Sequence, residues 1–310
     1  MRAVAVESVP ATPQVGDVEA PRPEAGEVLV EVASASVNGF DLSVAAGYVR
    51  EMMEHRFPLV LGKDFAGTVA GLGEGVDGFA VGDRVFGVVM KPVLQVGSLA
   101  KYATVPAAYG IVHVPEGLSF QDAGALGLAG TAALDSLDAA KVGQGDTVLV
   151  SGATGGVGAL AVQLAAARGA HVIATARPGT EADFVTGLTG GGVQVVDYTG
   201  DLEGQVRAIA PEGVDVVLHL AGDGVQLAGL LGEGGRIAST LGLSPDAVDG
   251  VTVHPIMADP NGRTLTALAE QAAAGTLRVP VTATYPLERA DEAFAAFGAG
   301  TLGKIAVTCS

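Results

Sequence analysis

The chain has 310 residues, which is long enough for two domains, and its formal net charge is −17 at pH 7. This excess of acidic residues leaves no broad basic face, which argues against nucleic acid or an anionic membrane as a partner. The single cysteine, Cys309, excludes an intrachain disulfide and a cysteine-based zinc site. No apolar run approaches the roughly 20 residues of a membrane span. The chain begins like a short strand rather than a leader segment, so we expect a cytoplasmic protein.

The distribution of strand and helix patterns predicts two domains. Residues 1–120 contain short strands separated by turn residues, with Val28, Val30 and Val32 alternating, as in a β-barrel-like domain. From Gln121 the pattern changes, first to a helix over 122–140 and then to strands alternating with helices. The predicted strands of this region are 147–151, 171–175, 193–196, 214–220, 235–240 and 251–254. Strands over 279–284 and 304–308 return to the first domain, which would comprise residues 1–120 and 262–310, with the α/β domain at 121–261.

A buried strand runs into a glycine turn and then a helix between Val148 and Arg168. Ala153, Gly155 and Gly158 have the spacing of G-x-G-x-x-G, with alanine in the first place. Small residues let the main chain approach a pyrophosphate closely, and the N-terminus of the following helix favours negative charge. We therefore expect a dinucleotide to contact this loop through the segment Ala153, Thr154, Gly155, Gly156 and Val157.

The end of the second predicted strand bears on the choice of cofactor. NAD enzymes usually place an acidic residue there for the ribose 2′-hydroxyl, whereas this chain has Thr175, Ala176 and Arg177. A guanidinium can pair with a 2′-phosphate, which a carboxylate would repel. This favours NADP(H), the alternative being that Arg177 is an ordinary solvated arginine.

Several further short motifs follow one another in a fixed order over nearly the whole chain. They are Gly26–Val30, Ser36–Asp41, Pro58–Val69, Gly82–Val85, Ala129–Ala132, the glycine turn, Val196–Tyr198, Gly234–Arg236 and Gly303–Ile305. Together they resemble the zinc-independent medium-chain dehydrogenase/reductase superfamily, and most closely its NADPH quinone oxidoreductase branch. The resemblance implies an α/β protein with a GroES-like β-barrel catalytic domain and a Rossmann domain with a doubly wound parallel sheet. Nicotinamide and substrate would meet in a cleft between these domains.

The chain departs from the zinc branch of this superfamily in its chemistry. Zinc alcohol dehydrogenases have cysteine where this chain has Asn38, and histidine followed by glutamate where it has Lys63 and Asp64. The five histidines form no close pair with metal-ligand spacing. We therefore expect no metal, and hydride transfer to an acceptor that is already polarised, either a quinone or an α,β-unsaturated carbonyl compound.

The resemblance also assigns roles to individual residues. Asn38 would donate to the nicotinamide ribose or the substrate carbonyl, unless it is a turn asparagine, and Asp41 would anchor that loop. Tyr48 would line the substrate pocket or supply a proton, with an exposed loop tyrosine as the alternative. Lys304 would lie near the cleft entrance, or else face solvent on its strand. The remaining cofactor contacts would come from Thr131 at the start of a helix, Tyr198 beside the adenosine, Ala221 in the turn after the fourth strand, and Leu241 and Gly242 after the fifth. His219, at the end of the fourth strand, replaces the family's aspartate or asparagine and puts the hydrogen bonding of that turn in doubt.

Three other classes of protein share part of this pattern. Short-chain dehydrogenases use a similar glycine loop, but no tyrosine here is followed four residues later by lysine, so that class is excluded. An enoyl or alkenal reductase with a dedicated substrate stays open, as does an NADPH-binding regulatory module without turnover. The resemblance further implies a homodimer that pairs through the strand over 251–254.

Overall fold

The computed structural model describes residues 1–309 and divides into two compact units. Unit 1 comprises Met1–Leu128 together with the stretch from Pro260 onward, and unit 2 comprises Ala129–Asp259. The first division lies within helix α2 (Phe120–Ala139), whereas the sequence pattern suggested a boundary just before that helix. Within residues 1–309, no helix combines the length and the apolar character needed to cross a membrane.

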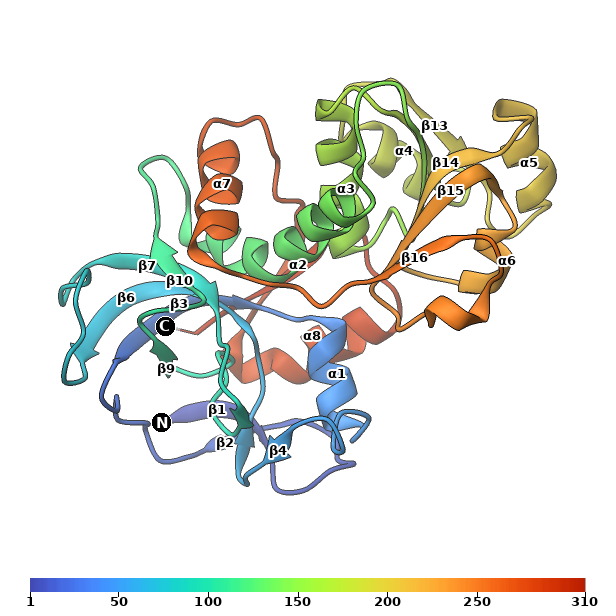
Figure 1. The fold of residues 1–310 in the computed structure, drawn as a ribbon. Coiled ribbons are helices and arrows are strands. Elements are labelled where there is room, and N and C mark those ends of the chain that lie inside the picture. The colour runs from blue at the N-terminus through green and yellow to red at the C-terminus, as the bar shows by residue number, and fades with distance from the viewer. Residues whose placement is uncertain (310) are drawn as a thin grey trace. The chain divides into compact units, whose positions relative to one another are not determined.

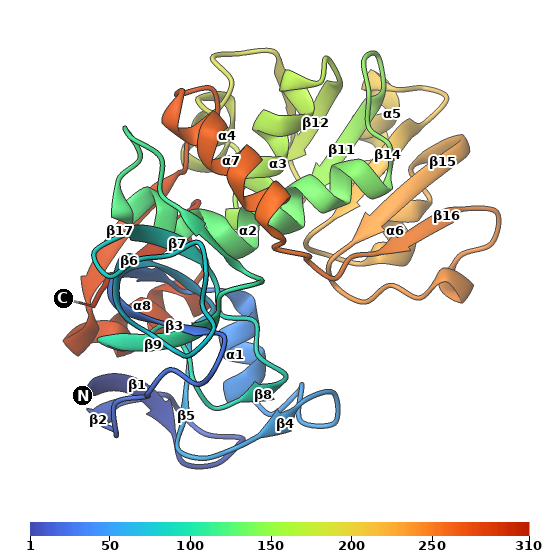
Figure 2. The same ribbon diagram turned by 60° about the vertical axis from the view of Figure 1, so that its left-hand side comes forward.

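A curled seven-stranded sheet forms the centre of unit 1 (Figure 2). Its strand order is β10-β7-β6-β3-β18-β17, with β9 also pairing with β3. The strands are β3 (Glu27–Ser36), β6 (Asp64–Leu72), β7 (Arg84–Val88), β9 (Tyr102–Pro106), β10 (Ile111–His113), β17 (Val281–Pro286) and β18 (Lys304–Thr308). One edge of β3 pairs with β9 near its start and with β18 near its end, which brings the last strand of the chain beside an early one.

The alternation of Val28, Val30 and Val32 explains how β3 packs. Successive side chains of a strand point to opposite faces, so these three valines share one face, and all three are fully buried. They belong to a core cluster that also contains Phe65 and Ile305. The remaining elements of unit 1 are β1 (Arg2–Val6), β2 (Gln14–Asp17), β4 (Glu54–His55), β5 (Leu59–Val60), β8 (Val93–Leu94), α1 (Gly39–Ala45), α7 (Gly262–Ala273) and α8 (Ala290–Gly298).

Unit 2 contains a six-stranded, fully parallel sheet, whose strands β14, β15 and β16 lie side by side in Figure 1. Its strand order is β13-β12-β11-β14-β15-β16, the order of a Rossmann sheet. The strands are β11 (Thr147–Ser151), β12 (His171–Thr175), β13 (Val193–Val196), β14 (Val214–His219), β15 (Leu231–Ser239) and β16 (Thr252–Pro255). The predicted fold class is confirmed, and β11, β12, β13 and β18 have the bounds predicted from the sequence. The start of β15 was predicted four residues too late, because its glycine-rich first residues pair irregularly with β14.

Helices cover the parallel sheet of unit 2. They are α3 (Gly156–Ala167), α4 (Thr180–Thr186), α5 (Leu202–Ile209) and α6 (Gly224–Ala228). On one face, Val206 of α5 and Leu227 of α6 pack with Leu149 and Ile173 of the strands. Burial on both faces explains why these strands are nearly continuous apolar runs.

One predicted helix position is wrong. Thr131 was expected at the start of a helix, but it lies in the middle of α2, which already begins at Phe120. Alanine and leucine on both sides of Thr131 continue the helix through it. Its side chain is fully buried, and Oγ1 has no hydrogen-bond partner among the described residues.

Candidate functional site

Where β11 leads into α3, two positions accept only glycine. Gly152 has φ +69°, and a Cβ there would lie 2.9 Å from the Cβ of Ala221. A Cβ on Gly158 would lie 2.1 Å from the carbonyl oxygen of Gly152, so the helix can approach the turn this closely only without a side chain. The sequence pattern identified Gly158 correctly but missed Gly152, which precedes the G-x-G-x-x-G spacing.

The N-terminus of α3 is open. The N–H groups in the first turn of a helix have no intrahelical partner, and Gly155, the N-cap residue, provides no side chain to cap them. A Cβ on Gly155 would meet only the carbonyl oxygen of Gly152, at 3.4 Å. The main-chain N–H groups of Gly156 and Val157 therefore belong to an uncapped helix start, an arrangement that suits a phosphate group. The residues of this turn fit a dinucleotide.

A pocket of about 350 Å³ adjoins the turn within unit 2. Four of the predicted cofactor contacts line it, namely Thr154, Thr175, Tyr198 and Ala221, together with Gly152 and Asp223. Ala153 and Ala176, which were also predicted, are buried beside it and present no side chain to solvent. Leu241 and Gly242 lie in the turn after β15, where the N–H of Leu241 donates to Ser239 Oγ at 3.2 Å.

Two hydroxyl groups at strand ends hold the pocket wall in place. Thr175 Oγ1 accepts the N–H of Gly152 at 3.0 Å, which ties the end of β12 to the glycine turn. Ser151 Oγ accepts the N–H of Leu220 at 3.1 Å and donates to the carbonyl of Ala221 at 2.8 Å. Thr175, predicted as a cofactor contact, thus also orients the loop, and the role of Ser151 was missed.

His219 organises the turn that follows β14. Its Nε2 lies 3.1 Å from the carbonyl oxygen of Gly222, which can only accept, so Nε2 carries a proton. Its Nδ1 lies 2.9 Å from Ser239 Oγ, and that oxygen accepts the N–H groups of Leu241 and Leu243. The hydroxyl hydrogen of Ser239 is therefore free to point toward Nδ1 of His219. A histidine thus supports this turn where the sequence left its hydrogen bonding in doubt.

Arg177 does not stand alone at the end of β12. Its Nε and Nη2 lie 2.8 and 2.6 Å from Glu181 Oε1, and its main-chain N–H donates to Glu181 Oε2 at 2.7 Å. Burial raises the pKa of Glu181, but its hydrogen bonds with Arg177 outweigh that effect and leave the pKa below its usual value. Glu181 was not predicted from the sequence, which has no acidic residue directly at the strand end, although the spacing of four residues from Arg177 suits an ion pair.

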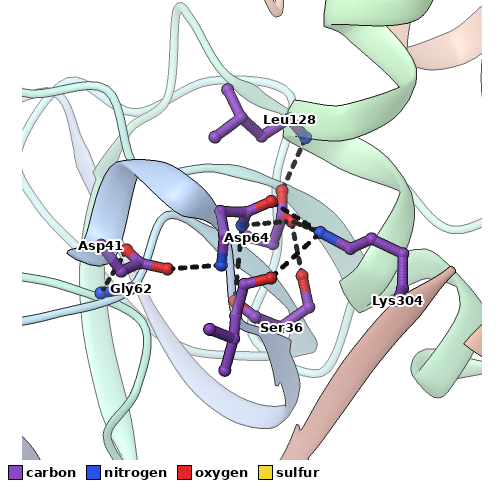
Figure 3. Close-up of polar contacts among 8 residues, drawn as sticks. Ser36, Asp41, Gly62, Asp64, Leu128 and Lys304 are labelled. Carbon is purple, nitrogen blue, oxygen red and sulfur yellow. Dashed lines mark hydrogen bonds and ion pairs between the residues drawn. The ribbon is translucent and has the colours of Figure 1, made fainter. Parts of the chain in front are cut away.

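A second group of polar residues is buried in unit 1 and centres on Asp64 (Figure 3). Its Oδ2 accepts Ser36 Oγ at 2.6 Å and Asn38 Nδ2 at 2.9 Å and pairs with Lys304 Nζ at 3.3 Å. Its Oδ1 accepts the N–H of Leu128 at 2.6 Å. We call Ser36, Asn38, Asp64 and Lys304 the Asp64 cluster. A fully buried carboxylate is tolerated here because each of its oxygens is hydrogen-bonded.

Lys304 fixes the orientation of the Asn38 amide. An ammonium can only donate, so the atom 2.6 Å from Lys304 Nζ is the amide oxygen, and the amide nitrogen turns toward Asp64 and the carbonyl of Ser36. Both ends of the Asn38 side chain are thereby engaged. The alternative of a solvent-facing Lys304 is wrong, because the pairing of β18 with β3 leaves its side chain only 3% exposed.

Asp41 and Lys63 are charged groups buried near this cluster. Asp41 accepts the N–H of Asn38 at 2.8 Å and that of Gly62 at 3.2 Å, which supports its predicted anchoring role. Burial raises the pKa of Asp41 to about 7, while the Asn38 hydrogen bond opposes the rise. Burial also lowers the pKa of Lys63 to about 8, against the pull of Asp41 and Asp64, and Lys63 Nζ donates to the carbonyl of Val89 at 2.6 Å.

Tyr48 has a different environment. It follows the C-terminal end of α1, whereas Asn38 caps the N-terminal end, and its side chain is 81% exposed. It lines a surface pocket of unit 1 together with Leu42 and Phe294. The structure thus places the two predicted catalytic residues at opposite ends of one helix. Among residues 1–309, no group of three or more histidine, cysteine or acidic side chains is arranged to hold a metal ion.

Comparisons with known proteins agree with this architecture. Residues 24–116 match the family described as alcohol dehydrogenase GroES-like domain, and residues 191–307 match the family described as zinc-binding dehydrogenase. A quinone oxidoreductase of Sus scrofa is 32% identical over 298 residues, covering 89% of this chain and 87% of that protein.

Two solved structures extend the comparison to the whole fold. An NAD-dependent alcohol dehydrogenase is 28% identical with a TM-score of 0.88, and all of both chains is covered. A mycobacterial protein complexed with NADPH is 26% identical with a TM-score of 0.86, and 99% of each chain is covered. The sequence match with quinone oxidoreductases and the shared two-unit fold lead to one conclusion: this chain belongs to the medium-chain dehydrogenase/reductase superfamily, in its quinone oxidoreductase branch.

Proposed function

We propose that the protein is an oxidoreductase that uses NADPH to reduce a quinone or an α,β-unsaturated carbonyl compound without a metal. The observation that carries this proposal is the uncapped N-terminus of α3, which lies beside a pocket lined by Tyr198 and by Thr175, a residue close in sequence to Arg177. When bound, the reduced nicotinamide supplies a hydride to the acceptor. The acceptor takes up a proton from solvent or from a weakly acidic side chain.

Different residues would bind the cofactor phosphates, orient the reactants and relay the proton. The N–H groups of Gly156 and Val157 would hold the pyrophosphate, while Arg177 and Tyr198 would lie against the 2′-phosphate. Asn38, held rigidly by the Asp64 cluster, would orient the nicotinamide ribose or the acceptor. Tyr48 is the side chain proposed to relay a proton, and Tyr48→Phe should lower turnover by about 10²-fold or less if water can substitute.

The charges around Asn38 support a reaction without a metal. The zinc branch would use residues at positions 38 and 63 as ligands, and this chain has an amide and a lysine there. The amide is bound to the Lys304 ammonium at 2.6 Å. An ammonium at this distance disfavours a second cation. Activity should therefore survive exhaustive chelation, whereas stoichiometric zinc that is lost together with activity would contradict the proposal.

Without a metal, positioning has to supply most of the rate enhancement. Holding two reactants in the correct geometry can contribute roughly 7 to 11 kcal/mol. Because this effect depends little on the identity of the acceptor, several quinones and enones should serve as substrates.

Oxidation of NADPH should be followed against a panel of quinones and enals, with cofactor binding measured separately. Turnover with several acceptors is expected. Tight NADPH binding without any turnover would instead favour a regulatory module. If neither NADPH nor NADH binds, the assignment of the glycine turn as the cofactor site is wrong.

A further inference from the structure

The candidate 2′-phosphate site contains both of the groups that dinucleotide enzymes use to distinguish NADPH from NADH. One is the Arg177 guanidinium, which is 61% exposed, and the other is the Glu181 carboxylate, which is 13% exposed. Glu181 accepts hydrogen bonds from both the guanidinium and the main-chain N–H of Arg177. The guanidinium proposed to meet the phosphate is therefore already engaged by a carboxylate.

A phosphate entering this site would compete with Glu181. The guanidinium has five N–H donors, of which Glu181 engages one on Nε and one on Nη2. The remaining donors can still bind a phosphate. The negative charge of Glu181 would, however, remain less than 3 Å from the same guanidinium and would repel the phosphate. Because the Arg177 side of this ion pair is open to solvent, which screens the charges, Glu181 reduces the affinity for the phosphate without abolishing it.

The same carboxylate favours the cofactor that lacks the phosphate. A carboxylate close to the end of the second Rossmann strand is the usual acceptor for the ribose 2′-hydroxyl of NADH. Glu181 is held close to the end of β12 through its bond with the main-chain N–H of Arg177. Although Glu181 lies in α4, the turn before that helix brings its carboxylate back to the end of β12.

We infer that Glu181 is the residue that sets cofactor selectivity, and that it narrows the preference for NADPH so that the protein binds both cofactors. This inference rests on the proposed function, because it assumes that the pocket beside the glycine turn holds the adenosine ribose.

Equilibrium binding of NADPH and NADH tests the inference without relying on turnover. Dissociation constants should be measured by fluorescence titration, and those of the fragments 2′,5′-ADP and 5′-AMP by calorimetry. In the native protein the two cofactors should differ by about tenfold or less. Glu181→Gln keeps an oxygen that can accept the N–H of Arg177 but removes the charge. It should shift the ratio toward NADPH by about tenfold, the usual scale for one charged hydrogen-bonded contact.

Three further variants separate a local effect of Glu181 from general effects of charge and folding. Glu233→Gln removes one negative charge from an exposed position on β15, three strands away from β12 in the sheet, and should leave the ratio unchanged. In an Arg177→Met background, Glu181→Gln should have a clearly smaller effect, because Glu181 acts mainly through the guanidinium. Glu181→Ala should shift the ratio in the same direction as Glu181→Gln, and circular dichroism should show that each variant is folded.

Each contrary outcome has a definite meaning. A native preference of more than about a hundredfold for either cofactor would overturn the inference, as would Glu181 variants that leave the ratio within twofold. Both results would leave the proposed function intact, since the cofactors would still bind. Absence of binding by both cofactors and both fragments would instead overturn the proposed function, and the inference with it.

Discussion

Asp41 links the stability of the protein to pH. Its pKa is about 7 in the folded protein and near 3.8 when exposed in the unfolded chain, chiefly because burial disfavours the carboxylate. Between these values the folded state binds more protons than the unfolded state. The resulting stabilisation is fully present below pH 3.8 and is lost as the pH rises through about 7.

The test is to compare Asp41→Asn with the native protein by denaturant unfolding at several pH values from 4.5 to 7. The native protein should show an additional loss of stability with rising pH of up to about 1.4 kcal/mol per pH unit, which the variant lacks. Equal pH slopes for the two proteins would show that Asp41 titrates normally.

Removing Lys304 should be costly. Lys304→Met leaves the fully buried Asp64 carboxylate without its cation, and breaking a buried ion pair from one side typically costs about 3 to 5 kcal/mol. Denaturant unfolding measures this loss. Arg289→Met is the matched control, because the pair Arg289–Glu292 is exposed to solvent and should contribute little to stability. Similar losses for both variants would mean that the Asp64 cluster is not a buried ionic network.

At the scale of elements, two glycines at the start of α3 should have different roles. We expect Gly158 to be needed for folding and Gly155 to be needed for cofactor binding. Gly158→Ala places a Cβ 2.1 Å from a main-chain oxygen, so α3 must shift and unit 2 should be destabilised. The Cβ of Gly155→Val would meet only one atom, at 3.4 Å, and the φ of −76° at this position suits any residue. This variant should fold with unit 1 intact, yet abolish NADPH binding and activity by blocking the pyrophosphate.

Thermal unfolding and NADPH titration of the two variants provide the comparison. The expected pattern is a lowered Tm for Gly158→Ala, and an unchanged Tm without cofactor binding for Gly155→Val. Full NADPH turnover by Gly155→Val would show that the glycine turn is not the cofactor site, and the functional proposal would fall with it.

At the scale of the whole molecule, the sheet of unit 2 ends in β16, whose outer edge has no partner strand within the described chain. An edge strand of this kind invites pairing with another chain, and two copies related by a two-fold axis would satisfy both edges. We therefore predict a homodimer that joins the two sheets through β16.

Light scattering at micromolar concentration should give twice the mass of one 30.7 kDa chain. Thr252→Lys places a charge at an exposed position of β16 and should shift the protein toward the monomer. Tyr102→Phe, on β9 of unit 1, is a control that should leave the mass unchanged. A native protein with the mass of a single chain would contradict the prediction.

The sequence by itself determined the features that depend on local pattern. Alternating valines predicted β3, and continuous apolar runs bounded by glycine predicted β11 and β12, because periodicity records which faces of an element are buried. The glycine spacing predicted the turn before α3. The short motifs predicted the family because they occur in the family's order over nearly the whole chain.

Only the tertiary structure decided which side chains meet. Lys304 contacts Asn38 across 266 positions because β18 pairs with β3, and no local pattern encodes that distance. The engagement of Arg177 by Glu181 depends on a turn that brings the start of α4 back to the end of β12. Periodicity describes the environment of each element, whereas the chemistry of a site depends on how the chain brings separate elements together.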